Sequence, residues 1–169
     1  MNDELVNKLI KEQRITNSML RLLIKQNVQK YYLPNNLEQL INHSFSLVHD
    51  DFAKVKLFVE TLAAKTGNKV IVLKSSEKPH VAADISSAGE GDYILVNNDN
   101  IISSDELIDV LLQAFKQKEI RFTVGKGASA TNVTLDVYNL NYVIYSDVEA
   151  LIPAEILAAF PIANTNKIN

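Results

Sequence analysis

Residues 1–32, MNDELVNKLIKEQRITNSMLRLLIKQNVQKYY, are the stretch around which the rest of this chain is organised. At 100° per residue, its apolar side chains fall within about a third of a helix circumference, which predicts one long amphipathic helix. The members of this apolar stripe are Leu5, Leu9, Met19, Leu20 and Leu23. Four basic side chains occupy nearly the opposite side: Lys11, Arg14, Arg21 and Lys25. The stretch is therefore expected to present one apolar face and one basic face.

A heptad frame also fits this helix, with alternate a and d positions at Val6, Leu9, Gln13, Thr16, Leu20, Leu23 and Asn27. Three of these seven positions are polar, and a polar residue at such a seam fixes register and oligomer number at a cost in stability. The frame covers only about three heptads, which is short for a self-sufficient coiled coil. We therefore expect the helix to pack on its own body or on a neighbouring chain.

Composition limits the classes of protein that this chain can represent. Of its 169 residues, 47% are apolar and 22% are charged, as in ordinary folded domains. The absence of cysteine excludes disulfides, thiol nucleophiles and thiolate metal sites. No apolar run approaches the roughly 20 residues that cross a bilayer. Asp3 and Glu4 precede every basic residue, which is wrong for a secretory signal. We expect a cytoplasmic or virion protein that is not secreted by a signal peptide and has no membrane partner.

The net charge of −3 is unevenly distributed along the chain. Residues 1–68 contain nine Lys/Arg and seven Asp/Glu, a balance of +2, whereas residues 69–169 contain eight and thirteen, a balance of −5. Such a split lets copies attract one another, or lets one end meet an anionic partner. A chance distribution over a solvated surface explains the same numbers.

The chain after the first helix divides into a helical and a sheet-forming part. Pro34 ends the first helix, and apolar spacing predicts a second helix over 37–48 and a third from Asp51 to a Gly67 cap. From residue 69 the period changes to two, which predicts strands at 69–74, 92–96, 120–124, 131–138 and 142–146. A polar loop with a short strand at 80–85 lies between the first two. Ser103 and Glu106 form a capping box for a helix to residue 118, and Pro153 begins a short C-terminal helix.

These elements predict an α+β fold. Its N-terminal region, residues 1–68, contains about three helices. Its second region, residues 69–169, is a small mixed β-sheet domain with one long helix and a short C-terminal helix.

Candidate chemical sites in the sequence are each better explained by local structure. The run Gly125-Lys126-Gly127-Ala128-Ser129 joins two predicted strands instead of opening a helix, so it indicates a hairpin turn and no phosphate loop. His43 and His49 are six residues apart, which is off the i, i+4 metal spacing. No serine lies in a Gly-x-Ser-x-Gly elbow. We therefore expect no catalytic residues, no cofactor and no metal, and hence no enzyme.

The basic face of the first helix is the strongest functional signal. We expect the partner-binding residues to be Leu9, Leu20 and Leu23, which would pack, and Lys11, Arg14, Arg21 and Lys25, which would steer. The leading hypothesis is a non-catalytic structural, assembly or adaptor protein in a homo- or hetero-oligomer, with a phage virion component as one setting. The alternative is a nucleic-acid-associated regulator that binds duplex phosphates through this helix. A small enzyme with an unrecognised site is a weaker alternative.

Overall fold

The computed structural model describes residues 3–26, 40–98 and 104–163, and for residues 20–26 it describes the backbone alone. The elements in chain order are α1 (Asp3–Gln26), β1 (Phe45–Val48), α3 (Phe52–Lys65), β2 (Val70–Leu73), α4 (Lys78–Ser86), β3 (Tyr93–Asn97), α6 (Asp105–Gln117), β4 (Glu119–Val124), η2 (Gly127–Ser129), β5 (Thr131–Asp136), β6 (Asn141–Ser146), η3 (Glu149–Leu151) and α7 (Ala154–Ala159). The predicted α+β class, with an N-terminal helix, is confirmed.

A parallel sheet of four strands, in the order β1-β6-β3-β2, forms the centre of the body. Phe45 is paired with Val143, Tyr93 with Asn141 and Val70 with Tyr93. Beyond β1, Ile162 adds an isolated parallel bridge to Ser46. Strands from both sides of residue 68 thus share one sheet.

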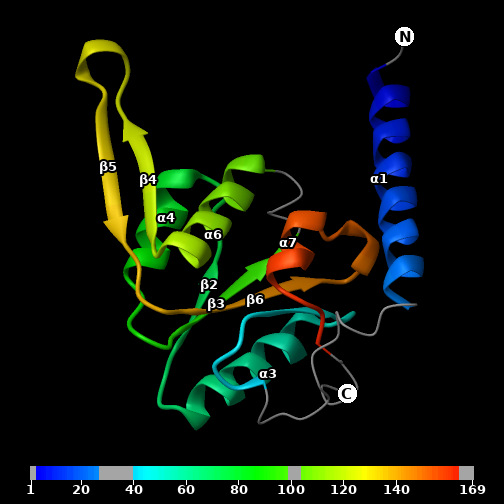
Figure 1. Ribbon diagram of the computed structural model, residues 1–169, viewed down its shortest axis with the longest axis horizontal. Helices are drawn as coiled ribbons and strands as arrows, with labels where there is room; N and C mark the ends of the chain where they lie inside the picture. The colour runs from blue at the N-terminus through cyan, green and yellow to red at the C-terminus, as the bar shows by residue number, and fades with distance from the viewer. Residues whose placement is uncertain (1–2, 27–39, 99–103, 164–169) are drawn as a thin grey trace.

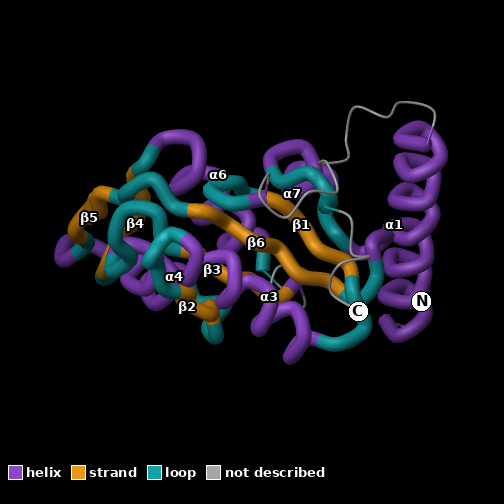
Figure 2. The backbone as a smooth tube through the Cα atoms, turned by 90° about the horizontal axis from the view of Figure 1, so that it is seen from below, coloured by secondary structure: helices purple, strands orange, loops and turns teal. Residues whose placement is uncertain are grey.

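Helices cover both faces of this sheet (Figures 1 and 2). On one face, α3 packs Val55, Val59 and Leu62 against strand residues such as Leu95 and Val143. On the other face, α4, α6 and α7 pack against the alternate strand residues, including Ile94 and Ile144. Strands covered on both faces are apolar along their whole length, which explains the near-continuous apolar runs of β3 and β6.

Two predicted elements are wrong. The second helix was expected to run to Val48, but Phe45–Val48 is the edge strand β1, which pairs with β6. The segment Phe45-Ser46-Leu47-Val48 is too short for its apolar spacing to distinguish a strand from a helix. The expected strand at 80–85 is instead inside α4, which has Pro79 in its first turn and buries Val81 and Ile85 at i, i+4 spacing.

The predicted hairpin is present as β4 and β5, which form a separate antiparallel sheet that projects from the body (Figure 1). Ile120 is buried at its base, whereas the tip is exposed. Gly125 occupies the turn with φ +88°, and a Cβ there would meet the Ser129 carbonyl oxygen at 2.9 Å. Glycine is therefore required at this turn.

Helix α1 stands as a second projection at the other end of the molecule (Figure 1). It contacts the body at η3, where Ser18 is buried. Most of its other described side chains are exposed. None of the helices that the structure describes is both long enough and apolar enough to span a bilayer.

Candidate functional site

The carboxyl ends of the parallel strands are the usual ligand position in an open α/β sheet. A nucleotide phosphate would there require a glycine-rich turn and free N–H groups at the start of the following helix. The β1–α3 junction has His49, Asp50 and Asp51 instead. The Asp51 carboxylate accepts hydrogen bonds from the backbone N–H groups of Ala53 (3.0 Å) and Lys54 (3.3 Å). The chain's own carboxylate thus occupies the place of an external anion.

Polar side chains link the ends of β3 and β6 at the same edge. The Asn98 amide donates to Ser146 Oγ (3.3 Å) and to the Leu151 carbonyl (3.2 Å), and Ser146 Oγ donates to the Val148 carbonyl (2.8 Å). Asn98 and Ser146 are both buried. Asn98 Oδ1 has no hydrogen-bond partner among the residues that the structure describes. This network fixes the turn after β6 against the end of β3.

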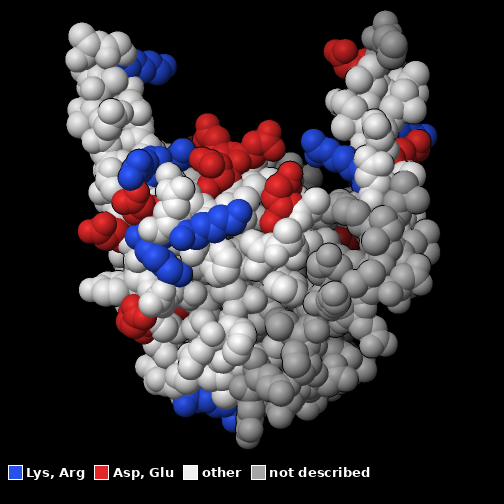
Figure 3. Space-filling view, viewed as in Figure 1, with Lys and Arg blue, Asp and Glu red and all other residues white. Residues whose placement is uncertain are grey.

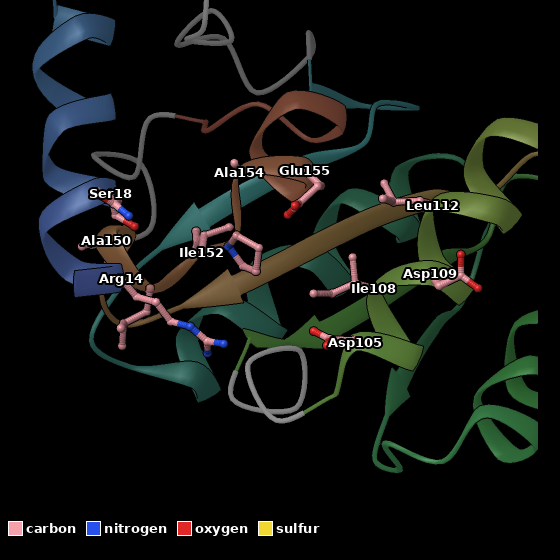
Figure 4. Close-up of a pocket in the computed structure, with 13 residues that line it drawn as sticks. Arg14, Ser18, Asp105, Ile108, Asp109, Leu112, Ala150, Ile152, Ala154 and Glu155 are labelled. Atoms are coloured by element: carbon pink, nitrogen blue, oxygen red, sulfur yellow. The ribbon is translucent and has the colours of Figure 1, made fainter. Parts of the chain in front are cut away.

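An open cleft of about 550 Å³ separates α1 from α6 and α7. Figure 4 shows Arg14 of α1 on one side and Asp105, Asp109 and Glu155 on the other. The opposite walls therefore carry opposite charge. Such a cleft attracts the basic side of α1 to the body and repels an external polyanion.

The partner-binding residues predicted on α1 are only partly described. Leu9 is 52% exposed and lies outside the hydrophobic core, and its expected packing against a partner stays a prediction. Lys11 and Arg14 are exposed, and Arg14 lines the acidic cleft. The side chains of Leu20, Arg21, Leu23 and Lys25 lie outside the described residues.

A second hollow, of about 500 Å³, lies where the hairpin meets the first turn of α4. We call it the hairpin groove, and its lining residues are Lys78, Arg121, Phe122, Thr123, Asn132, Val133 and Thr134. Lys78 Nζ lies 3.5 Å from the Asp109 carboxylate, and Arg121 pairs with Glu119. Thr123 Oγ1 donates to Asn132 Oδ1 (3.0 Å), which orients the Asn132 amide.

The strand register explains why these polar groups share one face. Arg121 is opposite Thr134, and Thr123 is opposite Asn132, so all four point to the same side of the hairpin. Ile120 and Phe122 alternate with them and pack against the core, although Phe122 also lines the groove. Lys78, at the start of α4, completes the lining.

The hairpin itself, residues 119–136, carries no net charge, because it contains two Lys/Arg and two Asp/Glu. Residues 116–130, which include the end of α6, contain four Lys/Arg and one Glu, a balance of +3. Figure 3 shows Lys and Arg side chains around the base of the hairpin with Asp and Glu side chains among them, and further Asp and Glu side chains between the two projections. The surplus of positive charge beside the hairpin therefore comes from Lys116 and Lys118 at the end of α6.

Sequence reasoning missed the hairpin groove, although one signal was present. The predicted strands and turn already place Arg121, Thr123, Asn132 and Thr134 on one hairpin face. Lys78 could not be placed there, because its approach depends on how α4 packs. Across the described ranges, no cluster of three His, Asp or Glu side chains is arranged to hold a metal ion.

Comparison with known proteins identifies the fold. No family model and no curated sequence matches the chain. Its structure is similar to those of Thermotoga maritima RuvB variants. One has a TM-score of 0.57 at 14% identity over 77% of this chain, and a second has 0.57 at 17% over 82%. A third has 0.53 at 13% over 96%. The chain spans less than half the length of these RuvB chains, covering 48%, 44% and 45% of them.

This likeness contradicts the leading functional hypothesis from the sequence. RuvB is an ATPase of DNA branch migration, and that role conflicts with a non-catalytic structural one. The expectation of a non-catalytic structural, assembly or adaptor protein is therefore wrong. At this level of identity the likeness establishes the fold alone, and it does not make this chain an enzyme.

Proposed function

We propose that this chain is a DNA-associated protein of RuvB-like fold, which binds the phosphate backbone of duplex DNA in the hairpin groove. The observation that supports the proposal is that Lys78 and Arg121 line one groove together with side-chain hydroxyl and amide groups. Cationic and hydrogen-bonding side chains of this kind make most protein contacts to DNA phosphate. Binding of this kind is largely independent of base sequence.

The ion pairs of the groove are compatible with phosphate binding. The Arg121 and Asp109 side chains are 66% and 69% exposed, and their partners Glu119 and Lys78 are each 25% exposed, so solvent reaches one member of each pair. Exposed pairs of this kind contribute little to stability. A phosphate can therefore replace a carboxylate as the partner of Arg121 at small cost, and the planar guanidinium matches it in bidentate geometry.

The RuvB likeness supports this proposal, because RuvB acts on DNA. The likeness also supports the proposal that this chain functions in an oligomer, since RuvB-like proteins function in oligomeric DNA complexes. Asp105, Asp109 and Glu155 form an acidic wall of the cleft beside α1, so the region between α1 and the hairpin is an unfavourable site for DNA. The hairpin end is the better position.

The proposal places no ATP phosphate at the β1–α3 junction. Two aspartates lie at this junction, and Asp51 already binds the helix N–H groups that a phosphate would require. In addition, the chain contains no Gly-x-x-x-x-Gly-Lys-Ser/Thr sequence.

The test is the affinity for a fluorescent duplex at several salt concentrations. Binding should weaken steeply between about 50 and 200 mM salt, because counterions are released on binding. The double variant Lys78→Gln/Arg121→Gln should reduce the slope of log affinity against log salt by about 0.9 for each phosphate that it no longer neutralises. The matched control is Lys54→Gln/Lys65→Gln, which also removes two exposed charges, from α3 on the other face of the sheet.

Arg14→Gln distinguishes the hairpin groove from the basic face of α1 that the sequence favoured. We expect it to leave affinity unchanged. The proposal fails if the chain binds no duplex at low salt, or if the α3 double variant and the groove double variant weaken binding equally.

A further inference from the structure

The ion pair between Lys78 and Asp109 connects the two hollows of the molecule. Lys78 Nζ, in the first turn of α4, lies 3.5 Å from the Asp109 carboxylate of α6. Lys78 lines the hairpin groove, whereas Asp109 lines the cleft beside α1. Figure 4 shows Asp109 at the end of that cleft away from Arg14. A change of charge at Asp109 in the cleft therefore acts on the groove through Lys78.

Lys78 requires an anionic neighbour. Its side chain is only 25% exposed, and a cation that is partly removed from water is stabilised by a partner of opposite charge. The first turn of α4 contains no acidic residue, and the positive end of the helix dipole disfavours a cation there. The nearby Glu77 carboxylate lies 3.2 Å from His80 Nδ1. Among the described residues, Asp109 is the carboxylate within ion-pair distance of Lys78.

Asp109 and a DNA phosphate compete for the same ammonium group. An ammonium group has several donors, so Lys78 can contact two anions at once. The two anions would then lie on either side of one ammonium group, and their repulsion would weaken the binding of the phosphate. Asp109 is 69% exposed, so water can hydrate its carboxylate when Lys78 leaves it. A phosphate therefore binds Lys78 best after Lys78 has separated from Asp109.

We infer that Asp109 restrains phosphate binding in the hairpin groove by holding Lys78, and that loss of the Asp109 charge releases Lys78 to a phosphate. This inference rests on the proposed function of the groove. The other cation of the groove, Arg121, pairs with Glu119 of its own strand, so that pair belongs to the hairpin alone. Asp109 belongs to α6 and lines the cleft, so it is the carboxylate through which a second surface regulates the groove.

The experiment measures the affinity of the full chain for the fluorescent duplex. Asp109→Asn should bind roughly two- to fivefold more tightly than the wild type, the range that a partly exposed ion pair accounts for. The slope of log affinity against log salt should steepen by up to about 0.9, because Lys78 then neutralises a further phosphate. The matched control is Asp105→Asn, which makes the same change one turn earlier on α6, in the same cleft, and should give a smaller gain.

A double-mutant cycle separates the release of Lys78 from the simple removal of a negative charge. In a Lys78→Gln background, Asp109→Asn should lose most of its gain in affinity, because no ammonium group is left to release. Circular dichroism checks that every variant is folded. An equal gain from Asp109→Asn in both backgrounds, or equal gains from Asp105→Asn and Asp109→Asn, overturns the inference and leaves the groove as the DNA site. A wild-type chain that binds no duplex overturns the proposed function, and this inference with it.

Discussion

The backbone N–H of Asp51 donates to Nδ1 of His49 across 2.9 Å, so the residue after β1 holds the residue that caps α3. This contact fixes Asp51 in the extended conformation from which its carboxylate reaches Ala53 and Lys54. The junction at which a nucleotide phosphate would bind is thereby filled from within the chain.

The first prediction concerns nucleotide binding at this junction. Magnesium ATP should leave the melting temperature unchanged, because a ligand stabilises a protein only when it binds the folded state. Asp51→Ala should destabilise the chain by about 1 kcal/mol through loss of the cap, and should gain no response to ATP. Differential scanning fluorimetry measures both quantities. A saturable rise in melting temperature with ATP would contradict this assignment of the junction.

A second prediction concerns Asp92 and pH. Burial raises the pKa of Asp92. The carboxylate also accepts hydrogen bonds from the Lys69 and Gly89 backbones and from the Asn68 amide, and it lies near the charge of Lys69. These interactions outweigh burial, so the pKa lies below its usual value of 3.8. The ionised carboxylate therefore contributes stability that is present above pH 3.8 and is lost as pH falls through the lower folded pKa.

Asp92→Asn tests this contribution. It places an amide N–H against the Gly89 N–H, and should destabilise the chain by about 1–3 kcal/mol at neutral pH. Its unfolding free energy should also change less than that of the wild type between neutral pH and about pH 3, because the titrating carboxylate is gone. Urea unfolding at several pH values measures both effects, and parallel curves for the two proteins would refute the prediction.

A matched pair of buried tyrosines gives the third prediction. Tyr142 is fully buried and its hydroxyl has no hydrogen-bond partner in the described part of the chain, and this burial raises its pKa well above the usual range. Tyr142→Phe removes an unsatisfied polar group and should leave stability within about 0.5 kcal/mol or increase it. The Tyr93 hydroxyl accepts a hydrogen bond from the Asn42 backbone at 3.0 Å, so Tyr93→Phe should cost about 1 kcal/mol. Equal losses in chemical denaturation would be inconsistent with these contacts.

Two glycines with positive φ give the fourth prediction. Gly67 (φ +73°) has no described atom near the position of a Cβ, whereas at Gly91 (φ +83°) a Cβ would meet Asn68 Nδ2 at 2.9 Å. Gly67→Ala should lower the free energy of unfolding by about 1 kcal/mol, because alanine is strained in the left-handed backbone conformation. Gly91→Ala should cost more, because Asn68 must also give up its bonds to the Glu90 carbonyl and to Asp92. Thermal unfolding of the two variants should rank them in this order.

Local sequence signals predicted the elements whose stability is encoded nearby. The long helix after β3 was expected from a serine cap at Ser103, and the structure has the cap one residue later at Ser104, whose Oγ accepts from Leu107 N–H at 3.2 Å. The hairpin turn was expected from the glycines at 125 and 127. The strand β1 was not predicted, because it forms by pairing with β6, which is about 100 residues away in sequence.

The candidate site likewise depends partly on local sequence and partly on tertiary packing. The polar alternation of β4 and β5 is a property of the sequence, but the hairpin groove also requires Lys78, which only the packing of α4 brings there. Likewise, the sequence alone determined that α1 has an apolar side and a basic side, because helical period fixes which residues share a face. Only the tertiary structure decided that the basic side faces the acidic wall of the body and that Leu5, Leu9 and Met19 are exposed. The reason is that long-range packing and charge determine how a helix is rotated against its neighbours.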